Sequence, residues 1–175
     1  MTSAVHTLME TIEEHDPELS EAERNRFRNI PSLKQAIKVA AESRKENGHP
    51  YGHQQRNWNF WPDAIPKATK ILLDAHDKIE ACSDLDEIHD LIKALLSDVK
   101  GLKELYCYDV AERIGAYRDC LPEKVYLHAG PLKAAKRLNL DWKKGYLEIW
   151  ELPECLRTYQ PCVIEDILCH YSRYC

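Results

Sequence analysis

The chain has 175 residues, a length typical of one domain, and 44% of them are apolar, which is enough to build one sizeable core. Its formal net charge of -5 disfavours non-specific binding to nucleic acid, because that binding depends on neutralising phosphates. No stretch approaches the roughly 20 uninterrupted apolar residues of a membrane span, and the N-terminal segment lacks the basic and apolar regions of a secretory signal. We therefore expect a single domain over residues 1–175, in the cytoplasm and away from membranes.

Seven cysteines are many for this chain, but their number is odd and the domain is long enough to fold without disulfide bonds. They are Cys82, Cys107, Cys120, Cys155, Cys162, Cys169 and Cys175. No two are separated by two residues, the spacing that a structural zinc site usually shows. We interpret them as reduced thiols and expect neither a metal site nor a cofactor.

Charge is distributed unevenly along the chain. Residues 93–144 contain eleven Lys or Arg against seven Asp or Glu, a balance of +4, so the rest of the chain has a balance of -9. A surface that meets an anion is therefore expected in this middle segment.

The predicted elements begin with an arm and two helices. The acidic residues 1–17 are expected to form a loosely ordered arm. Ser20 and Glu23 have the spacing of a capping box and predict a short polar helix. Ser32 is the expected cap of a second helix over residues 33–46.

Residues 47–66 are rich in Gly, Pro and Asn and are predicted to be a long loop, which in a compact domain is often functional. The loop combines indole and imidazole rings with a guanidinium group, as in sites that stack and hydrogen-bond unpaired bases or nucleotides. These residues are His49, His53, Arg56, Trp58 and Trp61. The same tryptophans are also explained if they fold the loop back over the core.

Two apolar stripes with helical spacing follow, from Ile65 to Cys82 and from Leu85 to Val99. The Ser-Asp-Leu-Asp between them supplies a turn and a cap, so we expect an antiparallel helix pair. Further helices are predicted over residues 108–117, 131–138, 153–159 and 161–174. Strand signals are weak and limited to residues 124–127 and 145–152, so the sequence predicts an all-α protein.

A glycine-bearing turn at Gly101 leads into a predicted helix with a small residue at Ala111. Val-Tyr-Leu-His at 125–128 then precedes a helix that ends in Lys-Arg-Leu-Asn-Leu at 136–140. Together, residues 99–140 resemble the helix-hairpin-helix region of the base-excision DNA glycosylase superfamily. The phrases YDVAERIGAY and VYLHAG are also similar to uncharacterised bacterial proteins. The resemblance implies a helix-hairpin-helix, DNA-glycosylase-like helical domain.

The catalytic groups of that family are absent from the matching positions. Asp109 stands where bifunctional glycosylases have a lysine, and Tyr126 stands where the family has its catalytic aspartate. Lys103 replaces the second glycine of the hairpin. The sequence also lacks the GxSxG and HExxH motifs. We therefore expect the architecture without base excision, in a non-catalytic binding protein associated with nucleic acid or nucleotides.

In that function, cationic side chains of the middle segment would meet the phosphates of DNA or of a nucleotide. The predicted binding residues are Lys100, Gly101, Lys103, Arg113, Lys133, Lys136 and Arg137. If the helices only pack together, the same cations form a solvated face. His128 is expected either to hydrogen-bond a ligand or to be a satisfied structural residue.

Two alternative functions remain open. One is a protein-interaction module, because Cys162 and Cys169 lie on the polar side of the last predicted helix, where a partner or a second copy would cover them. Accessible, oxidisable thiols are the other explanation of that face. The second alternative is a small-molecule enzyme with a helical pocket. Its candidate pocket residues are Asp109, Tyr126 and His128, with His53, Arg56, Trp58 and Trp61 of the loop.

Overall fold

The computed structural model describes residues 3–15, 17–44, 48–49 and 61–174. Over this part the chain is mostly helical and has one sheet of two short strands, which confirms the prediction of a mainly helical protein. Contacts within the chain divide it into two compact units, and each unit has buried apolar residues of its own. Unit 1 comprises Met1–Ala22 and Pro122–Cys175, and unit 2 comprises Glu23–Leu121.

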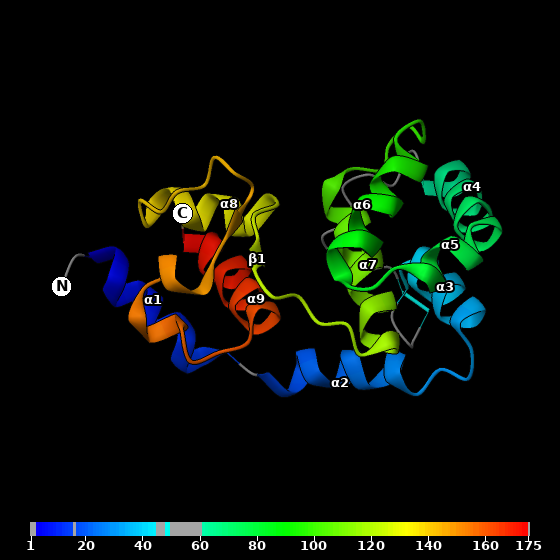
Figure 1. Ribbon diagram of the computed structural model, residues 1–175. Helices are drawn as coiled ribbons and strands as arrows, with labels where there is room; N and C mark the ends of the chain where they lie inside the picture. Colours follow the sequence, from blue (N-terminus) through cyan, green and yellow to red (C-terminus); the bar gives the residue numbers. More distant parts are fainter. Residues whose placement is uncertain (1–2, 16, 45–47, 50–60, 175) are drawn as a thin grey trace. The chain divides into compact units, whose positions relative to one another are not determined.

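Unit 2 is built mainly from helices. They are α2 (Pro17–Arg28), which belongs to this unit from Glu23 onwards, α3 (Leu33–Glu42), α4 (Trp61–Asp74), α5 (His76–Ala81), α6 (Leu85–Leu96) and α7 (Glu104–Arg118). Helix α3 packs on both α4 and α7, and α6 packs on α7 (Figure 1). Ile37, Ile88 and Ile114 are fully buried and belong to the core of this unit.

Side-chain caps set the beginnings of two of these helices. The Ser32 hydroxyl accepts a hydrogen bond from the Gln35 N–H at 3.3 Å, and the Asp84 carboxylate accepts one from the Glu87 N–H at 2.9 Å. Each cap satisfies a backbone donor that the first turn of a helix leaves without an intrahelical partner. The predicted cap at Ser32 and the predicted turn before α6 are both confirmed.

Two helices differ from their predicted bounds. Helix α2 begins at Pro17, whereas the capping-box spacing placed its beginning at Ser20. The apolar stripe from Ile65 to Cys82 is divided between α4 and α5, because the backbone leaves α-helical geometry at the buried Ala75, with φ -94 and ψ 11. The stripe therefore predicts which side chains are buried but does not predict the break.

Unit 1 combines helices with a two-stranded antiparallel ribbon. Its elements are α1 (Ser3–Glu14), β1 (Val125–Tyr126), α8 (Ala129–Arg137), β2 (Tyr146–Leu147), the 3-10 turns η2 (Ile149–Glu151) and η3 (Glu154–Leu156), α9 (Pro161–Tyr171) and the 3-10 turn η4 (Ser172–Tyr174). Val125 pairs with Leu147, and Tyr126 pairs with Tyr146. The two weak strand signals thus meet in one ribbon.

Helix α9 is the centre of unit 1 and packs on α1, α8 and β1 (Figure 1). The core around it includes Ile164, Ile167 and Leu168, all fully buried. The prediction of helices near residues 131–138 and 161–174 is confirmed, whereas the helix predicted over 153–159 is only the 3-10 turn η3. Among the described helices, none has the length and apolar character needed to cross a bilayer.

The N-terminal segment differs from the loose arm that its acidic composition suggested. Residues Ser3–Glu14 form helix α1, and Leu8 is fully buried in the core of unit 1 with Ile12 packed against it. The Tyr171 hydroxyl of α9 donates a hydrogen bond to the Ala4 carbonyl at 3.2 Å. Leu8 and Ile12 are four positions apart, so one side of the helix is apolar although its only Asp, Glu, Lys or Arg residues are glutamates.

Candidate functional site

The loop of residues 97–103 joins α6 to α7 in a short hairpin (Figure 1). Gly101 has a φ of +94, a backbone conformation that favours glycine, and the Leu102 N–H donates to the Val99 carbonyl at 3.3 Å. Val99 is buried, which fixes the loop to the unit, while Lys100 and Lys103 are exposed. The glycine-bearing turn predicted here is therefore present. Lys100 directly precedes Gly101, and Lys103 follows it by two positions.

Helix α7 begins at Glu104, and its N-cap residue Lys103 makes no side-chain hydrogen bond to the first turn. The exposed Glu104 carboxylate lies 3.0 Å from the Lys93 ammonium and 3.3 Å from the Nε2 atom of the buried His89, both on α6. This acidic charge is therefore balanced by α6. Burial lowers the pKa of His89 from its ordinary value, while the Glu104 carboxylate acts in the opposite direction.

Arg113 is on α7 but does not lie on a surface that could meet phosphates. Arg113 is only 7% exposed. Its Nε atom lies 3.3 Å from the Glu23 carboxylate, and its Nη1 atom donates a hydrogen bond to the Ser43 hydroxyl at 3.3 Å. The assignment of Arg113 to phosphate binding is therefore replaced by a structural role. The guanidinium group joins α2, α7 and the end of α3 inside unit 2.

The cations predicted on α8 belong to unit 1. Lys133 and Lys136 are exposed, and the Lys136 ammonium lies 4.3 Å from the centroid of the Trp142 ring. The half-buried Arg137 donates a hydrogen bond to the Tyr174 carbonyl and lies over the Tyr171 ring, so its charge is held against unit 1 itself. Two of the three predicted cations of α8 are thus presented to solvent.

Lysine and tyrosine side chains gather on one side of the β1–β2 ribbon. Because paired residues of two strands project to the same face, Tyr126 and Tyr146 share a face, and Val125 and Leu147 lie buried on the other. The Lys124 ammonium lies 5.4 Å from the Tyr126 ring centroid and 4.7 Å from that of Tyr146. The Lys144 ammonium lies 4.7 Å from the Tyr146 centroid. We call Lys124, Tyr126, Tyr146 and Lys144 the ribbon face.

Sequence reasoning missed most of the ribbon face. It named Tyr126 as the position of a lost catalytic group but did not name Lys124, Lys144, Tyr146 or Trp142. A signal was present, because Lys-Val-Tyr at 124–126 and Lys-Gly-Tyr at 144–146 both place a lysine two positions before a tyrosine. Both lysines precede their strands, and Gly145 has a φ of +82, so the cation–ring distances rather than strand alternation place each lysine beside a tyrosine.

A buried acid–base pair lies beside the beginning of α8. The Nε2 atom of His128 is 3.5 Å from the Oε1 atom of Glu165 on α9, and their side chains are 5% and 12% exposed. The next residue, Ala129, has a φ of +33, which is uncommon and strained for a residue other than glycine. Gly130 follows, and a Cβ atom there would be 3.0 Å from the Cys169 sulfur, so its missing side chain allows α8 to approach α9 closely.

The other predicted pocket residues belong to different parts of the chain. Tyr126 belongs to the ribbon face of unit 1, whereas Asp109 is a buried residue of α7 in unit 2. The loop candidates His53, Arg56 and Trp58 lie outside the described residues, as does the side chain of Trp61, and the described His49 is exposed. Asp109, which stands where bifunctional glycosylases have a lysine, is therefore a buried residue of α7 and not part of the exposed hairpin.

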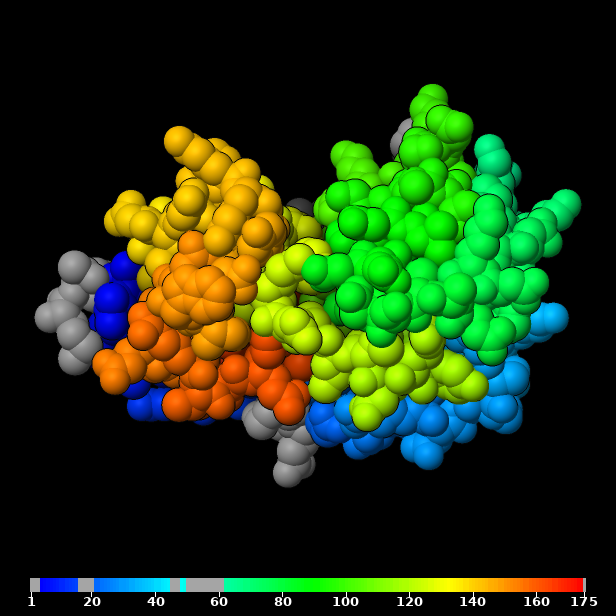
Figure 2. Space-filling model, viewed as in Figure 1, coloured from blue at the N-terminus to red at the C-terminus, as the bar shows by residue number. Residues whose placement is uncertain are grey.

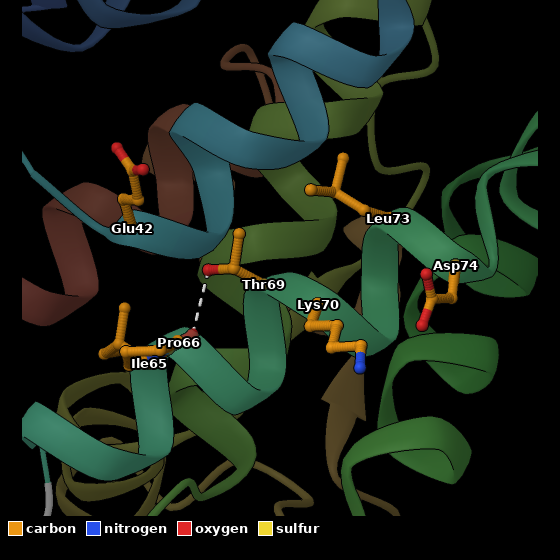
Figure 3. A pocket seen from close by; sticks show the side chains of 7 residues that line it. All are labelled: Glu42, Ile65, Pro66, Thr69, Lys70, Leu73 and Asp74. Atoms are coloured by element: carbon orange, nitrogen blue, oxygen red, sulfur yellow. Dashed lines mark hydrogen bonds between the residues drawn. The ribbon is translucent and has the colours of Figure 1, made fainter.

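An open groove lies over α3 and α4 and has a volume of about 430 Å³. Its lining is Glu42, Ile65, Pro66, Thr69, Lys70, Leu73 and Asp74. Figure 3 shows these side chains spread along the two helices rather than converging on one point. The Thr69 hydroxyl donates to the Ile65 carbonyl at 2.8 Å, so its hydrogen is used within α4. This open groove offers two carboxylates and one ammonium group, a poor arrangement for an anion.

Ligand atoms of His76, Asp77 and Glu80 lie within 4.8 Å of one another, a spacing that a metal ion could bridge. Asp77 and Glu80 are exposed, and the His76 ring lies 3.0 Å from the Asp77 carboxylate. The histidine lowers the pKa of Asp77, through a hydrogen bond and its charge. An exposed ion pair on the six-residue helix α5 explains these contacts without a metal.

The cysteines of α9 differ in their surroundings. Cys162 is 1% exposed, whereas Cys169 is exposed. The polar side of the predicted helix is therefore partly covered within the chain itself, and Glu165 on the same helix is also buried. Because Cys162 is already buried, the argument from this residue for an external partner no longer applies, and the protein-interaction alternative stays a prediction.

Comparison of the chain with protein-family models, with curated proteins and with solved structures finds no match. The resemblance to helix-hairpin-helix glycosylases therefore stays a prediction, and the geometry of the chain's own residues is what supports a function.

Proposed function

We propose that the protein binds nucleic acid without catalysing base excision, and that α6, the hairpin and α7 act as a glycosylase-like helix-hairpin-helix. The observation that supports this proposal best is the hairpin itself. It places the exposed Lys100 and Lys103 on either side of Gly101, which has a left-handed conformation. Helix α7 follows immediately, and its N-cap residue Lys103 makes no side-chain hydrogen bond to the first turn.

This arrangement suits a phosphate group. Backbone N–H groups at the beginning of a helix point along its axis, and the helix dipole favours a negative charge at that end. Glu104 would oppose an anion there, but its carboxylate lies 3.0 Å from the Lys93 ammonium and is thereby partly neutralised. Lys100 and Lys103 supply the remaining charge, so the hairpin would position a strand by its backbone without reading its sequence.

The side chains at the positions that matter for base excision support a non-catalytic role. Tyr126 replaces the family's aspartate, and its ring lies near the Lys124 ammonium on the ribbon face. Asp109, at the position of the bifunctional lysine, is buried and cannot act as an amine nucleophile. Single-turnover assays on duplexes with damaged bases are therefore expected to show no base release.

The binding test is a fluorescence-anisotropy titration of the full chain with labelled DNA at about 50 mM and about 200 mM salt, the range over which phosphate contacts weaken strongly. We expect binding at the lower salt concentration and a large loss at the higher one. A Lys100→Gln/Lys103→Gln variant should bind more weakly, while Lys67→Gln, an exposed lysine of α4, serves as the control. An absence of binding at low salt would contradict the proposal.

One observation favours a second candidate, an enzyme that acts on a small molecule. The buried His128 imidazole and Glu165 carboxylate are close enough for the carboxylate to orient the ring, and such a pair can move a proton. A thermal-shift screen with small carboxylic acids, amides and nucleosides tests this candidate. A ligand that stabilises the native chain but not the His128→Gln variant would support it, and a screen without any such ligand would not.

A further inference from the structure

The ribbon face and the residues that follow it along the chain are rich in lysine and arginine and are separate in sequence from the hairpin. Residues 122–147 contain six Lys or Arg against only two Asp or Glu, although unit 1 as a whole is acidic. The two acids are Glu123 and Asp141, and the Asp141 carboxylate accepts a hydrogen bond from the Lys143 N–H at 3.3 Å. Positive charge is therefore concentrated on this part of unit 1.

Aromatic rings accompany these charges. On the ribbon face, the Tyr126 and Tyr146 side chains are half-buried, and the two lysine ammonium groups lie over their rings. Trp142 is 38% exposed, and the Lys136 ammonium lies 4.3 Å from its ring centroid. A turn in which the Gly145 N–H donates to the Trp142 carbonyl at 3.2 Å connects the tryptophan to β2. Figure 2 shows this connection, in yellow and orange, at the surface of unit 1.

Exposed aromatic and apolar side chains accompany the basic segment in the described part of unit 1. Among the described residues, the large apolar side chains that remain exposed are Met9, Trp142, Trp150, Tyr159 and Tyr174, and all five belong to unit 1. Of these rings, Trp142 is the one paired with a lysine in the basic segment.

We propose that the ribbon face and the Trp142–Lys136 pair bind an unpaired nucleic-acid strand, an inference that rests on the proposed function and names its substrate class. An unpaired strand offers the two groups that this surface matches, because its bases stack on aromatic rings and its phosphates attract ammonium groups. A duplex keeps its bases stacked on one another, so it can use the lysines but not the rings.

The contacts of the lysines indicate which of them would bind the phosphates of the strand. Lys144 also lies 2.6 Å from the Glu151 carboxylate, which partly neutralises its charge, so Lys124 and Lys136 supply most of the charge for a phosphate. Lys124 and Lys136 have their ammonium groups over rings. When a base stacks on a ring, the ammonium group above it moves to a neighbouring phosphate, so that the cation–π contact is exchanged for a charge-assisted one.

The test measures the affinity of the full chain for three labelled probes of about 15 nucleotides, the upper range of one single-strand site. The probes are oligo-dT, oligo-U and a duplex of the same length. We expect both single strands to bind more tightly than the duplex, and a comparison of the two single strands distinguishes DNA from RNA as the natural source. The variant Trp142→Ala should weaken single-strand binding about tenfold, because one stacked base is lost.

Matched variants separate stacking from charge and from folding. Trp150→Ala is the control, because Trp150 is 70% exposed but lies in η2, between Glu148 and Glu151, rather than in the basic segment. Lys136→Gln should reduce the slope of log affinity against log salt for single-strand binding by about 0.7, because one phosphate contact is removed. Tyr146→Leu should weaken binding while thermal unfolding followed by circular dichroism reports whether unit 1 remains folded.

The results distinguish the two proposals. In one outcome, DNA binds and the Lys100→Gln/Lys103→Gln variant binds it more weakly, but Trp142→Ala and Tyr146→Leu bind the single strand with native affinity. This inference is then wrong, and the proposed function stands. Equal affinity for duplex and single strand, unchanged by Trp142→Ala, overturns the inference as well. If no probe binds at low salt, the proposed function fails, and this inference fails with it.

Discussion

The Nε2 atom of His128 and the Oε1 atom of Glu165 lie 3.5 Å apart although one residue precedes α8 and the other is in the middle of α9. Both side chains are buried in unit 1, where an ionisable group is unfavourable unless a partner compensates it. Ala129 and Gly130 lie directly after the histidine, so a strained residue and a close helix contact occur beside the pair. This part of unit 1 is accordingly sensitive to small changes in side-chain chemistry.

The variant Glu165→Gln should lower the free energy of unfolding by roughly 1–3 kcal/mol, because the buried imidazole then loses the carboxylate that lies 3.5 Å from its Nε2 atom. Urea unfolding at neutral pH measures the change. Glu154→Gln, at an exposed position of η3, is the control and should leave the free energy unchanged. Equal stability of Glu165→Gln and the native chain would show that the pair has no structural role.

The variant Arg113→Met should destabilise the chain by roughly 1–3 kcal/mol, because Glu23 and Ser43 would lose a buried partner while Glu23 remains partly solvated. Affinity for DNA, measured at a temperature where the variant is folded, should not change. Lys103→Gln gives the opposite pattern, with weaker binding and native stability. If a folded Arg113→Met variant has lost DNA binding, Arg113 contributes to the DNA interface and the structural role given above is wrong.

Acidification should destabilise unit 2 through His89. Burial lowers the pKa of this imidazole in the folded chain, so the unfolded chain takes up the proton more readily, and stability is lost as the pH falls below the ordinary histidine pKa of about 6.5. Stability measured at about pH 7.5 and about pH 5.5 should therefore fall less in His89→Gln than in the native chain. His6→Gln, at an exposed position of α1, should keep the native pH dependence.

The hairpin lysines should account for a defined part of the salt dependence of DNA binding. Each of Lys100→Gln and Lys103→Gln is expected to reduce the slope of log affinity against log salt by about 1 on duplex DNA, because one phosphate contact is removed. The loss should be the same for unrelated DNA sequences, since a phosphate contact reads no base. An unchanged slope in both variants would exclude the hairpin from the interface.

Gly115→Ala should destabilise unit 2 by about 1–3 kcal/mol, the usual cost of overfilling a packed contact. A Cβ atom at this position would be 2.5 Å from the Cys120 carbonyl oxygen and 2.8 Å from the Leu85 Cδ1 atom. The backbone oxygen is the decisive neighbour, because the Cys120 N–H is itself bonded to the Gly115 carbonyl at 2.8 Å and the turn cannot move freely. Lys38→Ala, on the exposed face of α3, is the control for thermal unfolding.

Much of the helical content could be predicted, because caps and apolar stripes act within a few residues. Ser32 caps α3, and α6 begins at Leu85 as its stripe indicated. The break at Ala75 and the burial of α1 could not be predicted in the same way. Whether a short amphipathic helix such as Ser3–Glu14 is loose or packed depends on the apolar surface that residues near Tyr171 offer to it.

The candidate site shows the same division between local and distant information. The turn at Gly101 is a local feature, and the sequence located it. Arg113 has the charge of a phosphate ligand, but its partner Glu23 is 90 positions away, so its burial was not visible. The ribbon face depends on a pairing of Tyr126 with Tyr146 between strands of two residues each, which are too short to give an alternating pattern.

Unit 1 combines two separate segments of the sequence, because α1 packs on α9, whereas unit 2 is one continuous segment. On a ribosome that adds about 5–20 residues per second, α1 waits on the order of ten seconds before the last helix is synthesised. During that interval the middle of the chain can already acquire its packed interior. The nascent protein therefore carries Leu8 and its neighbours without their final partners for longer than any other part of the structure described.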